Sequence, residues 1–394
     1  MTYIKLGRSE WEASQVVFDT TLLIWTILTI LFNYTTLGIA LGRDLTMLLY
    51  YVNRIALIFL LIKVIFMTKY RSNEIIAILI ILGAAFMTYL QSGSIVMLIL
   101  AAFIVASKDV KIDTTFQKMY KANLVLLCLI VLCALIGILP NKVTGVTSSR
   151  ACLGFIHPNN YGAMIISVIL LMLYCDWENM KLRHWIIIIG LFGMDVMFPK
   201  SKTAYYVIAF AVLLYFASRE FSGEYIKSIL RTILKWVPIV ILIATIALTY
   251  MYINGYSIAV KLNEMLTTRI YQMSYFWQTY SITLFGQYLN TVSSSAANSL
   301  NAMHALDNSY LNILLGSGVI IFILFVGSLL YMAVKATRMK NYKIACIVAC
   351  VFLWGFMETA IYKLWFNAII LLLQTVLYNQ NYLLGKDGKQ AYGR

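Results

Sequence analysis

Four long segments of this chain contain no charged residue, and they constrain its fold more than any other feature. They are residues 75–107, 122–141, 308–334 and 364–385. About 20 consecutive apolar residues are enough to cross the hydrocarbon core of a bilayer as an α-helix. In lipid only helices and closed barrels satisfy their backbone hydrogen bonds, and runs of this length are typical of helices. The sequence therefore predicts an all-α membrane protein.

The composition excludes most soluble classes of protein. Hydrophobic residues make up 61% of the 394 residues and charged residues 12%, and the mean hydropathy is +0.82. A soluble domain carries about 25% charged residues, so this chain lacks the polar surface that a water-soluble globule needs. Its six cysteines form no CxxC pair. Neither a zinc site nor a disulfide framework is therefore predicted.

The apolar segments predict a polytopic protein with about 12 transmembrane helices in one integral membrane domain, residues 1–394. One extracytoplasmic loop, residues 254–308 between the ninth and tenth helices, is much longer than the other connections. Loops of this length are usually functional or disordered. The helices are expected at residues 16–40, 46–67, 74–91, 94–107, 121–140, 160–175, 184–198, 202–217, 236–253, 309–334, 342–360 and 363–380.

The basic residues predict the orientation of these helices. When the N-terminus is placed inside, the segments on its side of the membrane contain 21 of the 31 Lys and Arg residues, and the opposite side contains 8. Cytoplasmic segments are enriched in Lys and Arg, so both termini are predicted to be cytoplasmic. Most of the formal charge of +15 thus reports topology, and no nucleic-acid partner is predicted.

The long loop begins with an amphipathic pattern. Its apolar residues recur at helical spacing: Leu262, Leu266, Ile270, Met273 and Trp277. We expect a short amphipathic helix on the outer membrane surface, followed at residues 291–299 by a stretch that could act as a lid. The competing interpretation is that the whole loop is a passive surface cap.

Three polar segments precede predicted helices on the outer face, at residues 149–162, 199–204 and 304–310. By the predicted topology these helices point their N-terminal ends outward, where unpaired N–H groups attract anions. Arg150, Lys202 and Arg269 add positive charge to the same face. The combination suits a phosphate or pyrophosphate group.

Each of these segments also has a purely structural interpretation. Ser201, Asp307 and Asn308 are ordinary N-cap residues. His157 and His304 are common loop residues, and the two arginines could anchor lipid headgroups. The coincidence of three such segments on one face favours a binding site.

Charged residues within the predicted helices are costly, at about 2.5–3.5 kcal/mol near the bilayer centre. Arg54 lies deep in the second predicted helix and is expected to be buried or to line a cavity. Asp195 and Glu358 lie near outer helix ends and could line the same cavity. The sequence contains no nucleotide-binding loop, HExxH or carboxylate-rich motif, so neither a metal nor a cofactor is predicted.

Four sequence elements occur in a recognisable order along the chain. They are Arg150 with Phe155-x-His157-Pro158-Asn159-x-x-Gly162, then Ser201-Lys202-Thr203-Ala204, then Arg269 with Leu284-Phe285-Gly286, and finally Asp307-Asn308-x9-Gly318.

Together these elements resemble the Wzy-type O-antigen and capsular polysaccharide polymerases and, more distantly, the O-antigen ligases. The layout of twelve helices with one long outer loop late in the chain is similar to that family. Two positions differ from its pattern. Lys202 replaces the usual arginine, and Asp307 stands where the ligases have histidine, which favours a polymerase.

The resemblance implies a glycosyltransferase of the bacterial plasma (inner) membrane. Such an enzyme transfers a growing glycan from undecaprenyl pyrophosphate onto a lipid-linked repeat unit at the outer leaflet, without a metal. The implied partners are membrane lipid, the undecaprenyl-pyrophosphate-linked oligosaccharide, and flippase and chain-length regulator proteins. The implied catalytic residues are Arg150 and Arg269, which stabilise the leaving pyrophosphate, and Asp307 or His157, which acts as the base. The substrate-binding candidates are Lys202, Asn159, Asn308, Ser201, His304 and Arg54.

Two other functions remain open at this stage. A lipid-linked oligosaccharide flippase or other transporter would also be polytopic, but transporters place polar residues near mid-bilayer in pseudo-repeated halves. An O-antigen ligase would share most of the motifs listed above. The clustering of polar residues on one face favours an enzyme over a transporter.

Overall fold

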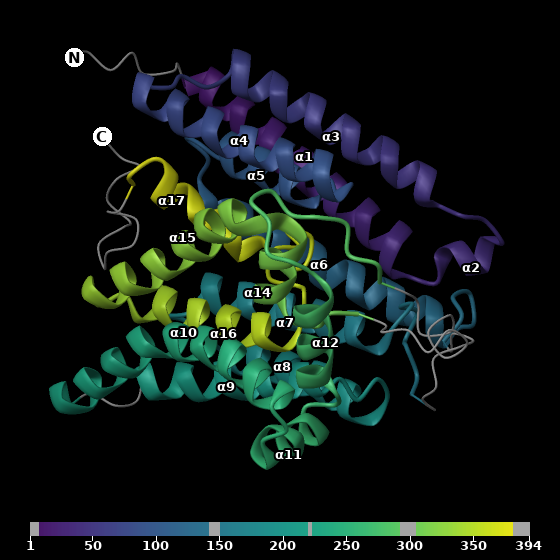
Figure 1. Ribbon diagram of the computed structural model, residues 1–394. Helices are drawn as coiled ribbons and strands as arrows, with labels where there is room; N and C mark the ends of the chain where they lie inside the picture. The colour runs from purple at the N-terminus through teal and green to yellow at the C-terminus, as the bar shows by residue number, and fades with distance from the viewer. Residues whose placement is uncertain (1–7, 142–149, 220–222, 292–304, 381–394) are drawn as a thin grey trace.

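The computed structural model describes residues 8–141, 150–219, 223–291 and 305–380. Within these ranges the chain is all-helical and forms no β-strand. Most of the helices lie roughly parallel or antiparallel to one another in a single bundle (Figure 1). The prediction of an all-α protein is confirmed for the described residues.

Most of the helices follow one another along the chain with short connections; the exceptions are residues 136–157 and 280–308. In order they are α1 (Arg8–Tyr34), α2 (Leu37–Leu41), α3 (Thr46–Phe66), α4 (Ser72–Ser92), α5 (Val96–Ala106), α6 (Ile112–Leu135), α7 (Pro158–Asp176), α8 (Leu182–Met197), α9 (Lys202–Arg219), α10 (Glu224–Ile253), α11 (Ser257–Met265), α12 (Arg269–Thr279), α14 (Ser309–Asn312), the π-helical turn η1 (Ile313–Ser317), α15 (Gly318–Arg338), α16 (Tyr342–Met357), the 3₁₀ turn η2 (Ala368–Leu373) and α17 (Gln374–Leu377).

Seven helices in the described part of the chain are long and apolar enough to cross a membrane. They are α1 from Glu12 onward, α3, α4, α6, α7, α10, and the continuous run of α14, η1 and α15. Shorter apolar helices are α5, α16 and the run of η2 and α17. These long apolar helices are consistent with a polytopic membrane protein.

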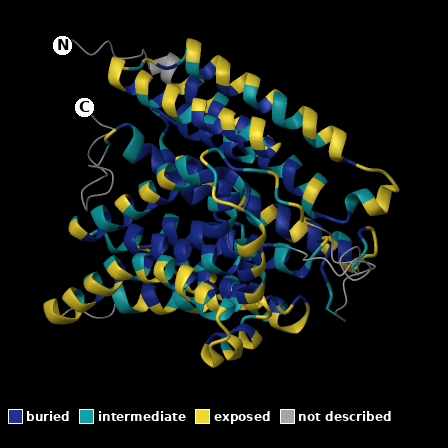
Figure 2. Cartoon of the chain, in the orientation of Figure 1, coloured by how far each residue is buried: buried dark blue, intermediate teal, exposed yellow. Residues whose placement is uncertain are grey.

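Burial is distributed as expected for a bundle in lipid. The central helix α7 is buried along nearly its whole length, packed by α6, α8, α9 and α16. The outer helices α3 and α10 instead expose large apolar side chains, such as Ile58, Phe66 and Ile243 (Figure 2). Because exposed apolar surface on this scale is unfavourable in water, these helix faces are suited to contact lipid.

Successive long helices alternate in direction and so give the bundle two distinct ends. At one end the starts of α1 and α6 are joined by an ion pair, with Lys118 Nζ 2.5 Å from Asp19 Oδ2. At the opposite end the chain just after α1 is held to the loop before α7, where the Thr36 N–H donates to Gly154 O at 2.9 Å. We call the first the basic end and the second the site end.

The predicted helix at residues 363–380 is wrong as a single helix. After α16 the chain runs through turns at residues 358–367 and then through η2 and α17. The turn is buried in protein, and Asn367 Nδ2 donates to Ile361 O at 2.9 Å. Irregular backbone is tolerated at membrane depth where protein side chains satisfy its polar groups.

The first predicted helix, residues 16–40, also ends earlier than expected. The helix stops at Tyr34, because the backbone N–H of Thr36 and its hydroxyl group both bond to Gly154 O rather than continuing the helical pattern. A separate short helix, α2, then follows.

The amphipathic pattern of the long loop forms two helices instead of one. Thr267 and Thr268, both with positive φ, separate α11 from α12. Ile270 and Met273 are buried against Leu306 and other residues of the chain, and α12 packs on α10. The apolar face of α12 therefore contacts protein instead of the membrane surface, which corrects the predicted surface helix.

Candidate functional site

The centre of the site end is a buried ion pair between residues far apart in sequence. Arg269, the first residue of α12, places Nη2 2.8 Å from Oε1 of Glu358, which follows the last residue of α16. Both side chains are about nine-tenths buried, at 8% and 12% exposed. A buried charge is costly unless it is paired and hydrogen-bonded, so this arrangement needs further partners.

Arg269 has an acceptor for each of its five N–H groups. Nε donates to a backbone carbonyl, Nη1 to a carbonyl and a hydroxyl, and Nη2 to a hydroxyl and the carboxylate. The acceptors are Met357 O at 2.7 Å, Leu266 O at 3.2 Å, Thr267 Oγ1 at 2.6 Å, Thr203 Oγ1 at 3.1 Å and Glu358 Oε1. The guanidinium group is thus fully used in holding the protein together at this point.

The two oxygens of Glu358 have different surroundings. Oε1 accepts hydrogen bonds from Arg269, from Asn159 Nδ2 at 2.7 Å and from the Thr203 hydroxyl group at 3.2 Å. Oε2 accepts none from the described residues. The carboxylate is therefore fixed through one oxygen and offers the other for chemistry.

His157 and Asp307 lie in the same electrostatic neighbourhood. His157 precedes α7, and its Nδ1 accepts a hydrogen bond from the Asn159 N–H at 3.1 Å, which caps the helix. Burial lowers the pKa of His157; Asp307 opposes this shift, while Arg150 and Arg269 reinforce it. The histidine is therefore held in its neutral form near pH 7.

The start of α14 is tied to the same point. Ser309 Oγ donates to the backbone oxygen of Glu358 at 2.5 Å, and Asn308 Nδ2 donates to Phe356 O at 3.1 Å. Asn308 Oδ1 also caps α14 by accepting from the Leu311 N–H. In this structure both atoms of the Asn308 amide bond to protein, so its capping role is directly visible.

Three predicted residues surround the start of α9. Arg150 Nη1 donates to Lys200 O at 3.3 Å, and this is its one hydrogen bond among the described residues. Lys202 is exposed. Ser201 is buried and its Oγ has no partner within the described part of the chain. Arg150 and Lys202 therefore keep donors that could meet an anion.

Glycines bring the sequence elements of the resemblance together. Gly162 of α7 lies against Ser201. A Cβ added to this glycine would lie 2.2 Å from the serine Oγ and would overlap it. Gly286 and Gly318 lie against each other with positive φ, and a Cβ at either would overlap the backbone of the opposite segment. Backbone crossings this close need glycine.

Two predicted site residues are not part of this cluster. Arg54 is half-exposed on α3, where its guanidinium carbon lies 3.0 Å from the centre of the Tyr50 ring. Arg54 was predicted to be buried or to line a cavity. Its side chain is only partly buried, and it makes no described contact with Arg269 or Glu358. His304 lies outside the described residues.

Sequence reasoning did not include two central residues among the site candidates. Glu358 was expected to line a cavity near an outer helix end without a role in the site, and Thr203 was noted only as part of a motif. The signal for Glu358 was present, because an acid at the end of a long apolar segment is costly without a partner. Nothing in the sequence identified Arg269, 89 residues away, as that partner.

The site can hold an anion at its rim and move a proton at its centre. In the described ranges no group of three His, Cys, Asp or Glu side chains is arranged to hold a metal ion.

Comparisons of the chain with protein-family models, with curated proteins and with solved structures found no match.

Proposed function

We propose that this protein is a polysaccharide polymerase of the bacterial plasma membrane, with both termini cytoplasmic. It transfers a growing glycan from undecaprenyl pyrophosphate onto a lipid-linked repeat unit. The main support is the convergence at Glu358 of side chains from three of the elements that carry the family resemblance. Asn159, Thr203 and Arg269 come from separate elements, and each bonds to the same carboxylate oxygen.

The first requirement of the reaction is to stabilise the leaving group. The bond between the anomeric carbon and the pyrophosphate oxygen breaks, and the pyrophosphate keeps the electron pair. Arg150 and Lys202 are the cations whose N–H groups are not all bonded to described protein acceptors. We therefore assign them to this anion. Arg269 acts as a positioning residue, since its N–H groups are already engaged by protein acceptors.

The second requirement is a base for the acceptor hydroxyl group. As that oxygen bonds to the anomeric carbon, its proton must move to an acceptor within hydrogen-bond reach. We assign this role to Oε2 of Glu358, because Oε1 is held by three donors and Oε2 by none of the described residues. Asp307 and His157, the bases predicted from the sequence, are the competing candidates.

The assignment is tested with purified protein and defined lipid-linked repeat units. Glu358→Gln keeps an oxygen that Arg269, Asn159 and Thr203 can bond but removes the base. Because it also removes the negative charge that offsets Arg269, we expect the variant to fold with lower stability, and its folded fraction to lose about 10²–10⁴-fold in turnover. Asp307→Asn and His157→Asn are the matched variants and should retain more activity. Near-normal turnover of Glu358→Gln would leave Glu358 with a positioning role alone.

The products also distinguish the competing functions. A deletion strain that accumulates single repeat units at the outer leaflet supports the polymerase. Long chains that remain unattached to their final acceptor would indicate a ligase, and repeat units trapped at the inner leaflet would indicate a flippase. Either of the last two results would overturn the proposed function.

A further inference from the structure

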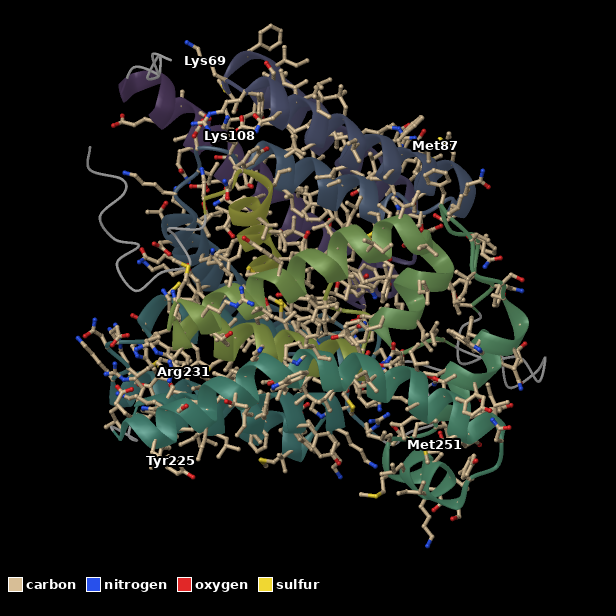
Figure 3. All side chains as sticks on the ribbon, turned by 60° about the vertical axis from the view of Figure 1, so that its left-hand side comes forward. Lys69, Met87, Lys108, Tyr225, Arg231 and Met251 are labelled. Atoms are coloured by element: carbon tan, nitrogen blue, oxygen red, sulfur yellow. The ribbon has the colours of Figure 1, made fainter. Side chains whose placement is uncertain are left out.

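A cavity of about 620 Å³ opens at the basic end of the bundle, at the opposite end of α7 from His157. It is bounded by the ends of α7, α9 and α15, the starts of α10 and α16, and the start of α17. Figure 3 shows Tyr225 and Arg231 of α10 at this end, among many nitrogen-bearing side chains, and Met251 toward the other end. This volume is in the range of small-ligand sites.

Four cationic side chains line the cavity, and two of them lack a protein partner. The side-chain amines of Lys227 and Lys340 form no hydrogen bond or ion pair with any residue that the structure describes. Arg219 pairs with Glu178, and Lys343 Nζ lies 4.0 Å from the centre of the Tyr174 ring.

Three carboxylates also line the cavity, and two of them are already engaged. Glu178 is paired with Arg219, and Asp113 accepts a hydrogen bond from the Tyr174 hydroxyl group at 2.9 Å. Glu224, exposed at the start of α10, is the third. The four cations outnumber the three carboxylates by one, so the lining carries one net positive charge, and Lys227 and Lys340 are its cations without a described partner.

A buried amide on the wall provides an independent observation. Gln374, the first residue of α17, is 1% exposed, yet neither its Nε2 nor its Oε1 has a hydrogen-bond partner among the described residues. A buried amide without hydrogen-bond partners is destabilising. The hydrogen-bonding capacity of this amide, at the wall of the cavity, is therefore left unfilled by the described residues.

We propose that this cavity binds a phosphate-bearing anion through Lys227, Lys340 and the Gln374 amide. Basic pockets between transmembrane helix ends are suited to the headgroups of anionic lipids. A free phosphate compound presents the same chemistry, so both sources are tested. The proposal does not depend on the proposed polymerase function, because the cavity and the candidate site lie at opposite ends of the bundle.

The test uses the full-length protein purified in uncharged detergent. Binding is measured by native mass spectrometry and by thermal shift with four probes: dihexanoyl phosphatidylglycerol, dihexanoyl phosphatidylcholine, glycerol 3-phosphate and inorganic phosphate. Lys227→Gln/Lys340→Gln removes the two cations. Lys335→Gln/Lys235→Gln removes the same charge at the same end from residues that do not line the cavity.

We expect phosphatidylglycerol to bind more tightly than phosphatidylcholine and the cavity variant to weaken it by at least about tenfold. The control variant should change affinity by less than about twofold. Binding of glycerol 3-phosphate or phosphate alone with the same sensitivity would identify a free phosphate compound as the ligand. Equal losses in the two variants, equal binding of both lipids, or no binding of any probe would overturn the proposal.

A second variant separates binding from folding. Gln374→Leu removes the unsatisfied amide at similar volume, so the ligand-free protein should melt no lower than the wild type. Its affinity for the phosphate-bearing probe should nevertheless fall. Unchanged affinity in this variant would exclude the amide from the site.

Discussion

At the scale of single residues, the pair of Arg269 and Glu358 dominates the site end. Breaking a buried ion pair by removing one partner leaves an uncompensated charge, whereas replacing both partners by apolar residues is often nearly neutral. For this buried pair we therefore expect single substitutions to lower the free energy of unfolding much more than they would in a surface pair.

Arg269→Met and Glu358→Met should each lower the free energy of unfolding by about 3–5 kcal/mol. The double variant should lose clearly less than the sum of the two. Arg219→Met breaks the exposed pair with Glu178 and is the control, with an expected loss below about 1 kcal/mol. Denaturant unfolding in detergent measures all four variants; additive losses in the double variant would contradict a coupled buried pair.

His157 makes the site end sensitive to pH. Because burial lowers its folded-state pKa below the usual value of about 6.5, the folded protein binds fewer protons in that range than the unfolded chain. The stability that the neutral histidine contributes is therefore complete above about pH 6.5 and is lost as the pH falls toward the folded-state pKa.

His157→Asn tests this dependence because asparagine caps helices well but does not titrate. Melting temperature measured from about pH 8 to about pH 5 should fall more steeply for the wild type than for the variant. If both proteins show the same slope, His157 is not the titrating group.

At the scale of elements, the glycines set how closely the helices and loops of the site approach. Gly162 lets α7 pack on the start of α9, and the crossing of Gly286 with Gly318 fixes the extended segment after α12 against the start of α15. The Val319 N–H donates to Thr283 O at 3.0 Å across this crossing. These contacts hold the starts of several elements in one place.

Gly162→Ala should therefore destabilise the protein by about 1–3 kcal/mol, and Gly318→Ala by more, because its positive φ adds strain. Gly193→Ala, on α8 with open space around it, is the control and should be neutral or slightly stabilising. Thermal melting in detergent gives the comparison. Equal tolerance of all three substitutions would show that the close approaches do not limit stability.

At the scale of the whole molecule, the alternation of helices gathers the connections into two groups at opposite ends. Lys69 and Lys108 lie at the basic end together with Arg231 (Figure 3). The side of the membrane that each end faces remains a prediction from the positive-inside rule.

Labelling with a membrane-impermeant maleimide tests that orientation. In a variant with its six cysteines replaced, Arg43→Cys should be labelled in intact cells, because it lies in the exposed connection between α2 and α3 at the site end. Lys69→Cys, in the exposed connection between α3 and α4, should be labelled only after permeabilisation. The reverse pattern would place the site end in the cytoplasm.

The sequence by itself determined the helical fold class, most of the helices and the segments that meet at the site end. Long uncharged runs leave a chain in lipid few alternatives to helices, and the spacing of the charged residues sets where they end. Local pattern failed at residues 363–380, where a side-chain hydrogen bond within a buried turn holds irregular backbone. It also failed at the break between α11 and α12, where two residues with positive φ interrupt the helix.

The tertiary structure alone decided which partner each polar side chain has. Arg269 was predicted to meet a ligand, yet its N–H groups are used within the protein, and the carboxylate it holds is Glu358. The reason is physical: a buried charge takes whichever partners the packing of distant helices brings within about 3 Å. The distance between two such side chains in space cannot be read from the residue types or from their order along the chain.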